Sequence, residues 1–461
     1  MTTRRTFLFG ASSVALTGCL SSPTFRRAGG DLRLSFGVLS DIHITDWAST
    51  EVFRKALAYF RDQGVDAVMI AGDMADHGLL PQLENVAKAW YSVFPDDRAP
   101  DDRHVEKLFV YGNHDPEGLD YRDGAMKRTF QAMNMTYEEA EKVQIRTVGR
   151  AACWERCFHE KYEPIYRKRV RGYDFIGGHW CTGSGVDGLE EWFAAHGDSL
   201  PKDRPFFYFQ HASPAATVYG DDSWGDDDGR SSRALAAFPN AVAFSGHSHR
   251  SLTDLRSYWR GEFTSVGTST LSYVCLPGGR RNATDYRTRL DGRQGQIVRV
   301  YDDRLEFWRR DFHLDEDIDD PVVLPLPARA ATFGISGLSR TAMPAFPKGA
   351  QVKLTIDGRH VAAAFPGALA NPTARPWDYD VHFEVRLKGE KRLKEADAGI
   401  WFHPDAIRAR AHLASHGTVV VQADRGKFPS TVEAVRVYVF ARSSYCIVGD
   451  RLVTDWLPFR A

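Results

Sequence analysis

The sequence predicts an α/β protein in which a sheet-centred domain is followed by a smaller β-rich domain. Two observations predict the first domain. Short apolar runs alternate with amphipathic stretches from Leu32 onward, and several apolar runs end in a polar side chain. Such alternation is typical of a mostly parallel sheet with helices on its faces. A third observation predicts the second domain, because residues from about 330 to 461 contain short strand-like runs such as QVKLTIDGRHVAAAF.

Length and composition support this organisation. A chain of 461 residues is long enough for two or three domains on the usual scale of about 100–200 residues per domain. Hydrophobic residues make up 43% of the chain, which argues against extensive disorder. The charges of the 59 Lys and Arg residues nearly cancel those of the 60 Asp and Glu residues. The chain therefore lacks the excess positive charge typical of nucleic-acid-binding proteins, and no nucleic-acid partner is expected.

Residues 1–19 read as an export signal. Arg4 and Arg5 precede an apolar stretch that is too short to span a bilayer as a mature helix. TRRTFL resembles a twin-arginine signal and LTGC resembles a lipobox, which implies that Cys19 becomes the lipidated first residue. Residues 20–31 read as a flexible tether. These features predict a bacterial envelope protein, in the periplasm or on the outer face of the cytoplasmic membrane, either lipid-anchored or secreted. An ordinary apolar N-terminus is the alternative.

The elements of the first domain follow in order. LRLSFGVLS predicts a strand that ends at Asp41, and apolar residues at helical spacing predict a helix over 49–61 with Gly64 as its stop. VDAVMIAG predicts a strand that ends at Asp73, a helix is expected over 82–91, and KLFVYG predicts a strand that ends at Asn113. Three more runs, YDFIGG, FFYFQ and AVAFSG, are strand candidates. Polar residues therefore gather at the strand ends.

The composition changes at two further places. Residues from about 116 to 170 are charged and contain methionines, which predicts a helical, cap-like insertion over one edge of the sheet. Beyond Asp311 an acidic and then proline-rich run predicts a domain boundary. The predicted domains are thus 32–312 and 325–461. In the second domain an Asp-Gly pair between two strand-like runs predicts a hairpin.

Five strand ends carry residue types that bind metals. The blocks are SDIH with Asp41 and His43, AGDMAD with Asp73 and Asp76, YGNHD with Asn113, His114 and Asp115, FQHASP with His211, and SGHSH with His247 and His249. Ligands bind beyond the carboxyl ends of strands in such sheets, where loops converge. Carboxylate, amide and imidazole donors suit Mn, Fe or Zn, and two ions need about six or seven ligands with one shared carboxylate.

In this order the blocks resemble the calcineurin-like metallophosphoesterase family, whose pattern is DxH, GDxxD, GNH[DE], a lone His and GHxH. The resemblance covers about residues 35–312 and implies two packed sheets flanked by helices. It implies that one metal ion is held by Asp41, His43 and His249, that a second is held by Asn113, His211 and His247, and that Asp73 bridges them. It also implies that a hydroxide between ions about 3.5–4 Å apart attacks a phosphoester substrate in line.

The remaining residues of the blocks receive expected roles. His114 is expected to be the general acid, with Asp115 holding its ring in orientation. Asp76 is expected to accept a hydrogen bond from a ligand or from its turn. Asp76 and Asp115 also fit plain hydrogen-bonded loop residues. Gly246 is expected to let the chain turn between its strand and His247.

Some features leave alternatives. The acidic loop 219–233 fits a pocket wall, with Trp224 stacking on a base or sugar, as well as it fits a solvated loop. The arginine-rich run 280–293 fits phosphate contacts, although a solvated segment is favoured. The predicted function is a metal-dependent phosphoester hydrolase, acting on monoesters or diesters. The alternative is an envelope binding or structural protein with a vestigial metal site.

Overall fold

The computed structural model describes residues 30–119, 149–181, 185–220, 223–276, 280–281, 293–328, 343–369, 376–388, 409–410, 417–443 and 448–459. The predicted export signal, most of the tether and nearly all of the arginine-rich run lie outside these residues. Within the described ranges no helix has the length and apolar character needed to cross a bilayer.

The first sheet combines parallel and antiparallel strands. Its order is β14-β13-β12-β1-β2-β3, with β15 paired to β13. The strands are β1 (Leu34–Leu39), β2 (Ala67–Ala71), β3 (Glu106–Val110), β12 (Gln294–Val300), β13 (Arg304–Asp311), β14 (Glu316–Asp317) and β15 (Val322–Pro325). Pairing is parallel from β1 to β3, and antiparallel from β1 through β12 to β13 and its partners. Four of these six strand pairings are antiparallel, so the expectation of a mostly parallel sheet is wrong for this sheet.

The end of the first domain also differs from the prediction. The acidic and proline-rich run that predicted a boundary forms β14 and β15, which continue the first sheet on β13. Arg260 Nη2 donates to the carbonyl oxygen of Ala328 at 2.8 Å. The first domain thus extends to about residue 328 rather than 312. The composition of this segment resembles a linker, but its backbone pairs with β13 of the first sheet.

The second sheet has the order β4-β5-β6-β7-β9-β8. Its strands are β4 (Ile165–Val170), β5 (Tyr173–Gly178), β6 (Phe206–Phe209), β7 (Ala241–Ser245), β8 (Tyr258–Arg260) and β9 (Thr264–Gly267). Pairing is parallel from β5 to β9, and the edge strands β4 and β8 are antiparallel. A two-stranded pair, β10 (Cys275–Leu276) and β11 (Arg280–Arg281), lies outside both sheets.

The predicted cap over 116–170 is only partly described. Residues 120–148 lie outside the described residues. After them, α6 (Arg150–Phe158) buries Trp154 and Phe158 in the core beneath the helices, and β4 pairs with β5 along its full length. Residues 150–170 are therefore part of the α/β domain and not of a cap.

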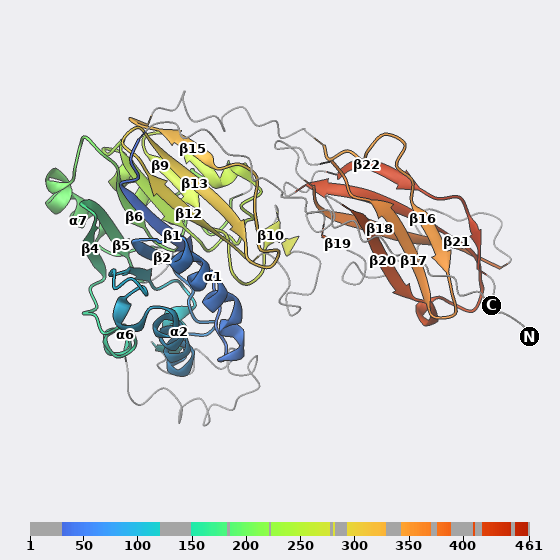
Figure 1. Ribbon diagram of the computed structural model, residues 1–461, viewed down its shortest axis with the longest axis horizontal. Coiled ribbons are helices and arrows are strands. Elements are labelled where there is room, and N and C mark those ends of the chain that lie inside the picture. The colour runs from blue at the N-terminus through green and yellow to red at the C-terminus, as the bar shows by residue number, and fades with distance from the viewer. Residues whose placement is uncertain are drawn as a thin grey trace, which may run out of the picture.

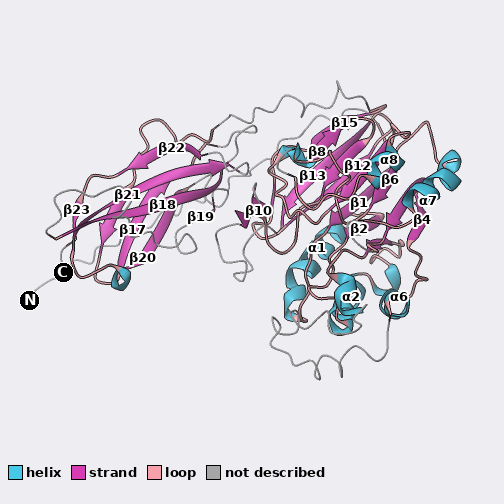
Figure 2. Ribbon diagram, turned by 180° about the vertical axis from the view of Figure 1, so that it is seen from behind, coloured by secondary structure: helices cyan, strands magenta, loops and turns pink. Residues whose placement is uncertain are grey.

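The two sheets pack face to face (Figures 1 and 2), and buried aromatic residues lie between them. Phe36 of β1 contacts Phe175, Phe207 and Phe244 of the second sheet, with ring centroids 5.2, 4.9 and 5.8 Å apart. Edge-to-face packing of this kind suits the aromatic quadrupole. The prediction of two packed sheets flanked by helices is confirmed.

Helices cover the outer faces of both sheets. The first is covered by α1 (Glu51–Asp62), α2 (Leu80–Val93) and α6, and the second by α7 (Leu189–His196) and α8 (Arg230–Leu235). In α1 the residues Phe53, Leu57 and Phe60 recur at helical spacing and are fully buried. Gly64 follows with a φ of 71°, the left-handed conformation that ends helices. Short helices are α3 (Asp115–Leu119), η1 (Ala48–Thr50), η2 (Pro95–Asp97), η4 (Gly197–Ser199), η6 (Leu255–Ser257) and η12 (Arg425–Lys427).

The C-terminal region contains two antiparallel sheets around a separate core. One is β16 (Lys353–Ile356), β17 (His360–Pro366) and β20 (Thr418–Asp424), and the other is β18 (Pro376–Leu387), β19 (Ala409–Arg410), β21 (Val432–Ser443), β22 (Val448–Val453) and β23 (Leu457–Pro458). Burial alternates along β20, as expected of strands with one face in a core. The Asp-Gly hairpin is confirmed: β16 pairs with β17, and Asp357 Oδ1 accepts the amides of Arg359 and His360 at 2.6 and 2.7 Å.

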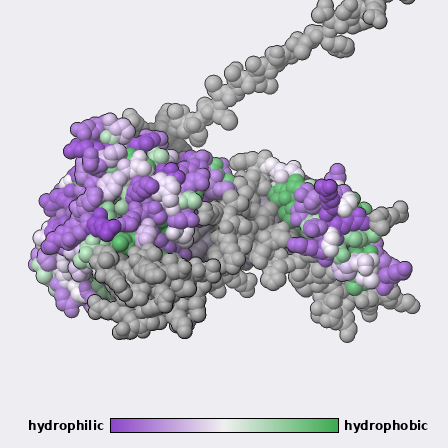
Figure 3. All heavy atoms as spheres, turned by 90° about the horizontal axis from the view of Figure 1, so that it is seen from below, coloured by the Kyte–Doolittle hydropathy of each residue, from purple (hydrophilic) through white to green (hydrophobic). Residues whose placement is uncertain are grey.

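Hydrophilic residues cover most of the described surface on the face shown in Figure 3, with apolar patches between them. Among the large apolar side chains that stay exposed is Trp224, which is 37% exposed. Most apolar side chains of the α/β domain are instead buried between or beneath its sheets.

Candidate metal centre

The carboxyl ends of strands from both sheets meet at one edge of the α/β domain. Beyond β1 and β2, the amide of Asp41 donates to Gly72 O at 3.0 Å. Beyond β6 and β7, the amide of Gly246 donates to His211 O at 2.9 Å. The amide of His247 then donates to both carboxylate oxygens of Asp41, at 3.2 and 3.1 Å. The bonds from His247 to Asp41 thus join the two sheets at the edge where the blocks converge.

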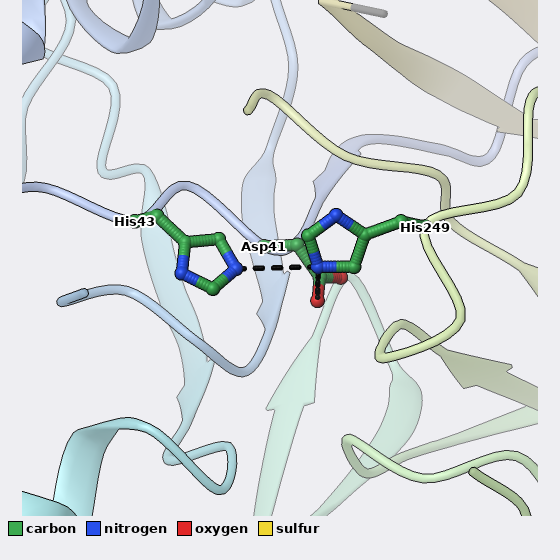
Figure 4. Close-up of side chains that lie close together, drawn as sticks. All are labelled: Asp41, His43 and His249. Carbon is green, nitrogen blue, oxygen red and sulfur yellow. Dashed lines mark hydrogen bonds and ion pairs between the residues drawn. The ribbon is translucent and has the colours of Figure 1, made fainter. Parts of the chain in front are cut away.

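The first cluster contains Asp41, His43 and His249, whose side chains point toward one another (Figure 4). His249 Nε2 lies 2.9 Å from Asp41 Oδ1 and 3.2 Å from His43 Nε2. The outer ring nitrogens are occupied: His249 Nδ1 bonds Tyr273 O at 2.7 Å, and His43 Nδ1 bonds Asp76 Oδ1 at 3.1 Å. Since those oxygens are acceptors, each neutral ring presents its Nε2 lone pair inward. Two lone pairs and a carboxylate that face one point fit a cation.

The second cluster contains Asp73, His211 and His247, together with the amide of Asn113. His211 Nδ1 bonds Ala71 O at 2.8 Å, which leaves Nε2 as the inward lone pair. That Nε2 lies 3.0 Å from Asp73 Oδ2, 3.0 Å from Asn113 Oδ1 and 3.1 Å from His247 Nδ1. The donor set again fits a cation, and it mixes nitrogen and oxygen atoms as Mn, Fe and Zn sites do.

Asp73 lies between the two clusters. Its Oδ2 is 3.0 Å from His211 Nε2 of the second cluster and 3.9 Å from His43 Nε2 of the first. Burial works to raise the pKa of Asp73, but the charges of His211, His114 and His43 outweigh it and hold that pKa well below its ordinary value. This buried carboxylate therefore stays ionised within reach of both clusters.

The pKa values of the histidines in the two clusters shift in different directions. Burial lowers the pKa of His43, and it lowers the pKa of His247 to about 4 with a further contribution from His211. Burial also acts to lower the pKa of His211, but the carboxylates of Asp73 and Asp41 raise it to about 9. The site thus favours positive charge near Asp73 and Asp41, as a cation-binding pocket requires.

Backbone strain is concentrated at the clusters. Left-handed φ values are found at five of their residues, namely Asp41 (49°), His43 (51°), Asp73 (50°), His247 (66°) and His249 (52°). Such a conformation costs about 1–3 kcal/mol at a residue other than glycine, and it tends to accumulate at functional sites. The strand ends are therefore bent so that these side chains converge.

Gly246 has a different role from the one expected. Its φ lies outside the left-handed region, so the turn does not require glycine conformational freedom. A Cβ atom at this position would instead collide with Asp41 Oδ2 and Ser40 Oγ. Glycine is needed here because the backbone passes directly over the buried Asp41 side chain.

His114 lies beside the clusters, and its ring is held by a different residue from the one predicted. Its amide donates to Asp73 Oδ1 at 2.9 Å, and its ring Nδ1 bonds the main-chain oxygen of Asp76 at 2.7 Å. Burial acts to lower the pKa of His114, but the charges of Asp73 and Glu117 raise it above its ordinary value. With Nδ1 occupied, Nε2 is the ring atom left to exchange a proton.

The prediction that Asp115 orients the His114 ring is wrong. The Asp115 carboxylate accepts three main-chain amides, those of Gly112 at 2.8 Å, Ala75 at 2.8 Å and Met74 at 3.3 Å. It is completely buried. Asp115 therefore ties the loop after β2 to the loop after β3 and acts on the site through the backbone.

Asp76 contacts a histidine of the first cluster. Its Oδ1 bonds His43 Nδ1 at 3.1 Å, and its Oδ2 lies 3.0 Å from His77 Nε2. His77 was missed by the sequence analysis. Burial acts to lower the pKa of His77, while Asp76 and Glu117 raise it to about 9. The only sequence signal for it is its place directly after the GDxxD block.

Replacing Asp115 with Ala is expected to lower the free energy of unfolding by about 2–4 kcal/mol, because three buried amides lose their acceptor. Urea unfolding monitored by circular dichroism measures this loss. Asp62→Ala is a matched control, since Asp62 is exposed at the end of α1. A stability equal to that of the control would contradict this role for Asp115.

Comparison with known proteins agrees with the arrangement of these blocks. Residues 34–251 match the family described as calcineurin-like phosphoesterase. Similar solved structures include a dimetal phosphatase from Danio rerio, with 12% identity over 62% of this chain and 98% of that one and a TM-score of 0.37. GAP50, the anchor in the inner membrane complex of Plasmodium, is 10% identical over 65% of this chain and 90% of its own chain, with a TM-score of 0.36. A novel archaeal phosphodiesterase is 12% identical over 63% of this chain and 100% of its own chain, with a TM-score of 0.25. No curated protein matches the chain. The match to the calcineurin-like phosphoesterase family therefore covers the part of the chain in which the five blocks converge.

Proposed function

We propose that this protein is a metal-dependent phosphoester hydrolase with a dinuclear centre. The observation that carries the proposal is the convergence of Asp41, His43 and His249 on one point and of Asn113, His211 and His247 on another, with Asp73 between them. A vestigial site in an envelope binding protein is less well supported, because every ligand type of the family pattern is present and the Nε2 atoms of His43, His211 and His249 face inward.

The ligand residues form two sets, each of which would bind one divalent ion. The three residues of the first cluster would bind one ion through two Nε2 atoms and a carboxylate. Asn113, His211 and His247 would bind the other, and Asp73 would contact both. Two bound ions would neutralise phosphate oxygens and lower the pKa of a water molecule so that it can attack phosphorus. Nitrogen and oxygen donors suit Mn, Fe or Zn.

His114 supplies the proton that the leaving group needs. Its Nδ1 bonds Asp76 O, which fixes the ring and leaves Nε2 on the side of Asp73, 3.9 Å from Asp73 Oδ2. A proton donated from Nε2 to the leaving oxygen avoids the release of a strongly basic alkoxide. His114 thus acts on the leaving group, while the clusters bind the phosphoryl group.

The direct test is turnover by the purified protein after loading with Mn. A panel of phosphomonoesters and phosphodiesters, including 4-nitrophenyl phosphate and bis(4-nitrophenyl) phosphate, covers both reaction types. Hydrolysis that depends on Mn and is lost with a chelator is the expected result. Absence of turnover on every ester by protein that retains two ions would refute the proposal and favour the binding alternative.

His247→Ala and His249→Ala are expected to empty different metal positions. His247 lies with Asn113 and His211, whereas His249 lies with Asp41 and His43. Each variant should keep about one ion per chain, and anomalous diffraction should find it at opposite positions. An exposed histidine, His196, gives the control His196→Ala, which should retain two ions. Loss of the same ion from both variants would contradict the assignment.

We also propose that a lipid on Cys19 tethers the protein to the bacterial envelope. Support comes from the Arg4-Arg5 pair and the LTGC block in the sequence. Both lie outside the described residues, and both precede the α/β domain in the sequence. Cys19→Ser is expected to move the protein from the membrane fraction to the soluble fraction after cell breakage. Retention in the membrane fraction would show that Cys19 is not the anchor.

A further inference from the structure

Three aromatic side chains border the two clusters. The ring centroids of Trp224 and His247 are 5.3 Å apart at 48°, and those of Trp180 and His247 are 5.7 Å apart at 43°. On the other side, the Tyr273 ring lies 4.2 Å from that of His249. Trp224 and Trp180 thus contact the same imidazole of the second cluster, while Tyr273 covers the first. The motifs of the family pattern contain none of the three.

The loop that carries Trp224 lies against the metal site. A Cβ at Gly225, whose φ is 75°, would collide with the ring of His247, so the backbone next to Trp224 lies against that ligand. Asp226 forms a bridge with Ser213. Asp227 is buried and accepts the amides of Ala215 at 3.1 Å, Gly229 at 2.9 Å and Ser231 at 3.1 Å. These bonds anchor the loop that follows Trp224 to neighbouring segments, while Asp228 in the same loop stays exposed.

Trp180 is held in place by its own main chain. Its amide donates to Tyr111 O at 3.0 Å, and its carbonyl oxygen accepts Arg150 Nη1 at 2.6 Å. The Trp180 side chain is partly exposed, and Trp224 is 37% exposed. Two large rings that keep exposed surface beside the same imidazole offer that surface to a planar ring of a ligand.

We propose that the substrate of this site carries a planar aromatic ring, a nucleobase or an aryl group, that stacks on Trp224 with Trp180 as a second contact. The inference rests on the proposed function, because the phosphoryl group must bind at the two clusters for the ring to reach Trp224. Rings in proteins stack or tilt against one another with centroids about 4.5–7 Å apart, which is the scale of the Trp224 and His247 contact. Trp224 is then a specificity-determining residue and takes no part in bond cleavage.

The test compares ligands that differ only in the ring. Isothermal titration calorimetry on the Mn-loaded protein measures the Kd of phenylphosphonate against propylphosphonate, and of adenosine 5′-phosphate against ribose 5-phosphate at a temperature and time without turnover. The wild-type protein is expected to bind the ring-bearing member of at least one pair about tenfold or more tightly, the scale of base stacking on one aromatic side chain. A preference in both pairs indicates any planar ring, and a preference in the nucleotide pair alone indicates a nucleobase.

Variants assign the preference to Trp224. Trp224→Leu is expected to weaken only the ring-bearing ligands, by about tenfold, and Trp224→Phe to restore part of the loss. Trp192→Leu is the control, because Trp192 stacks on His196 in α7, away from the clusters. Equal Kd values within both pairs, or an equal loss for both members of a pair in Trp224→Leu, would overturn the inference. Those outcomes are separate from the proposed function, which fails only if no phosphoester is hydrolysed.

Discussion

Asp73→Asn is expected to lower kcat/KM for phosphoester hydrolysis by about 10³-fold or more and to leave fewer than two metal ions per chain. The substitution keeps the size of the side chain and an oxygen that can accept the His114 amide, which bonds Oδ1 at 2.9 Å. It removes the negative charge that lies 3.0 Å from His211 Nε2 and 3.9 Å from His43 Nε2. The loss therefore reports the charge between the two clusters rather than a change in packing.

The measurement combines steady-state kinetics with metal analysis by mass spectrometry. Asp62→Asn makes the same chemical change on the surface, where Asp62 pairs only with the neighbouring Arg61 in the described structure, and should keep full activity and two ions. If Asp73→Asn keeps more than about a tenth of the wild-type kcat/KM with both ions bound, Asp73 does not bridge the clusters.

Much of the site could be predicted from the sequence because its signals are local. Each block follows an apolar run, and parallel strands bring their carboxyl ends to the same edge of a sheet. β1, β2 and β3 are parallel neighbours, and so are β6 and β7. Asp41, Asp73 and His247 therefore arrive together with their neighbours, as the order of the blocks indicates. The antiparallel pairing of β1 with β12 joins residues more than 250 positions apart, and nothing in the local pattern of either strand specifies it.

Other features depended on contacts that no local pattern records. Asp115 follows His114 in the chain, yet its carboxylate accepts hydrogen bonds from the amides of Met74 and Ala75 in another loop. Only the three-dimensional positions of the two loops bring these groups together. Position in the sequence therefore gave the wrong partner. Which ring nitrogen of each histidine faces inward depends in the same way on distant acceptors such as Ala71 O and Tyr273 O. Trp180 and Tyr273 approach the clusters from segments without a motif, so the sequence carried no signal for them.

His114→Ala is expected to lower kcat by about 10²–10⁴-fold for alkyl phosphoesters and by less than about tenfold for 2,4-dinitrophenyl esters. An alkoxide leaves readily only when it is protonated, whereas a dinitrophenolate is stable as an anion and needs no acid. The substitution is selective, because the main-chain amide that bonds Asp73 Oδ1 remains in the alanine variant. What is lost is the ring, whose Nδ1 is fixed by Asp76 O and whose Nε2 faces the site.

A series of leaving groups with graded pKa values measures this effect as the slope of log kcat against the pKa of the leaving group. The slope should become steeper in His114→Ala, while metal analysis should still find two ions, because His114 belongs to neither ligand set. His104→Ala provides the control, since His104 is exposed and pairs with Glu106 at 3.1 Å. An equal loss for every leaving group would mean that His114 positions the substrate or Asp73, and the proton would then have to come from another donor such as solvent.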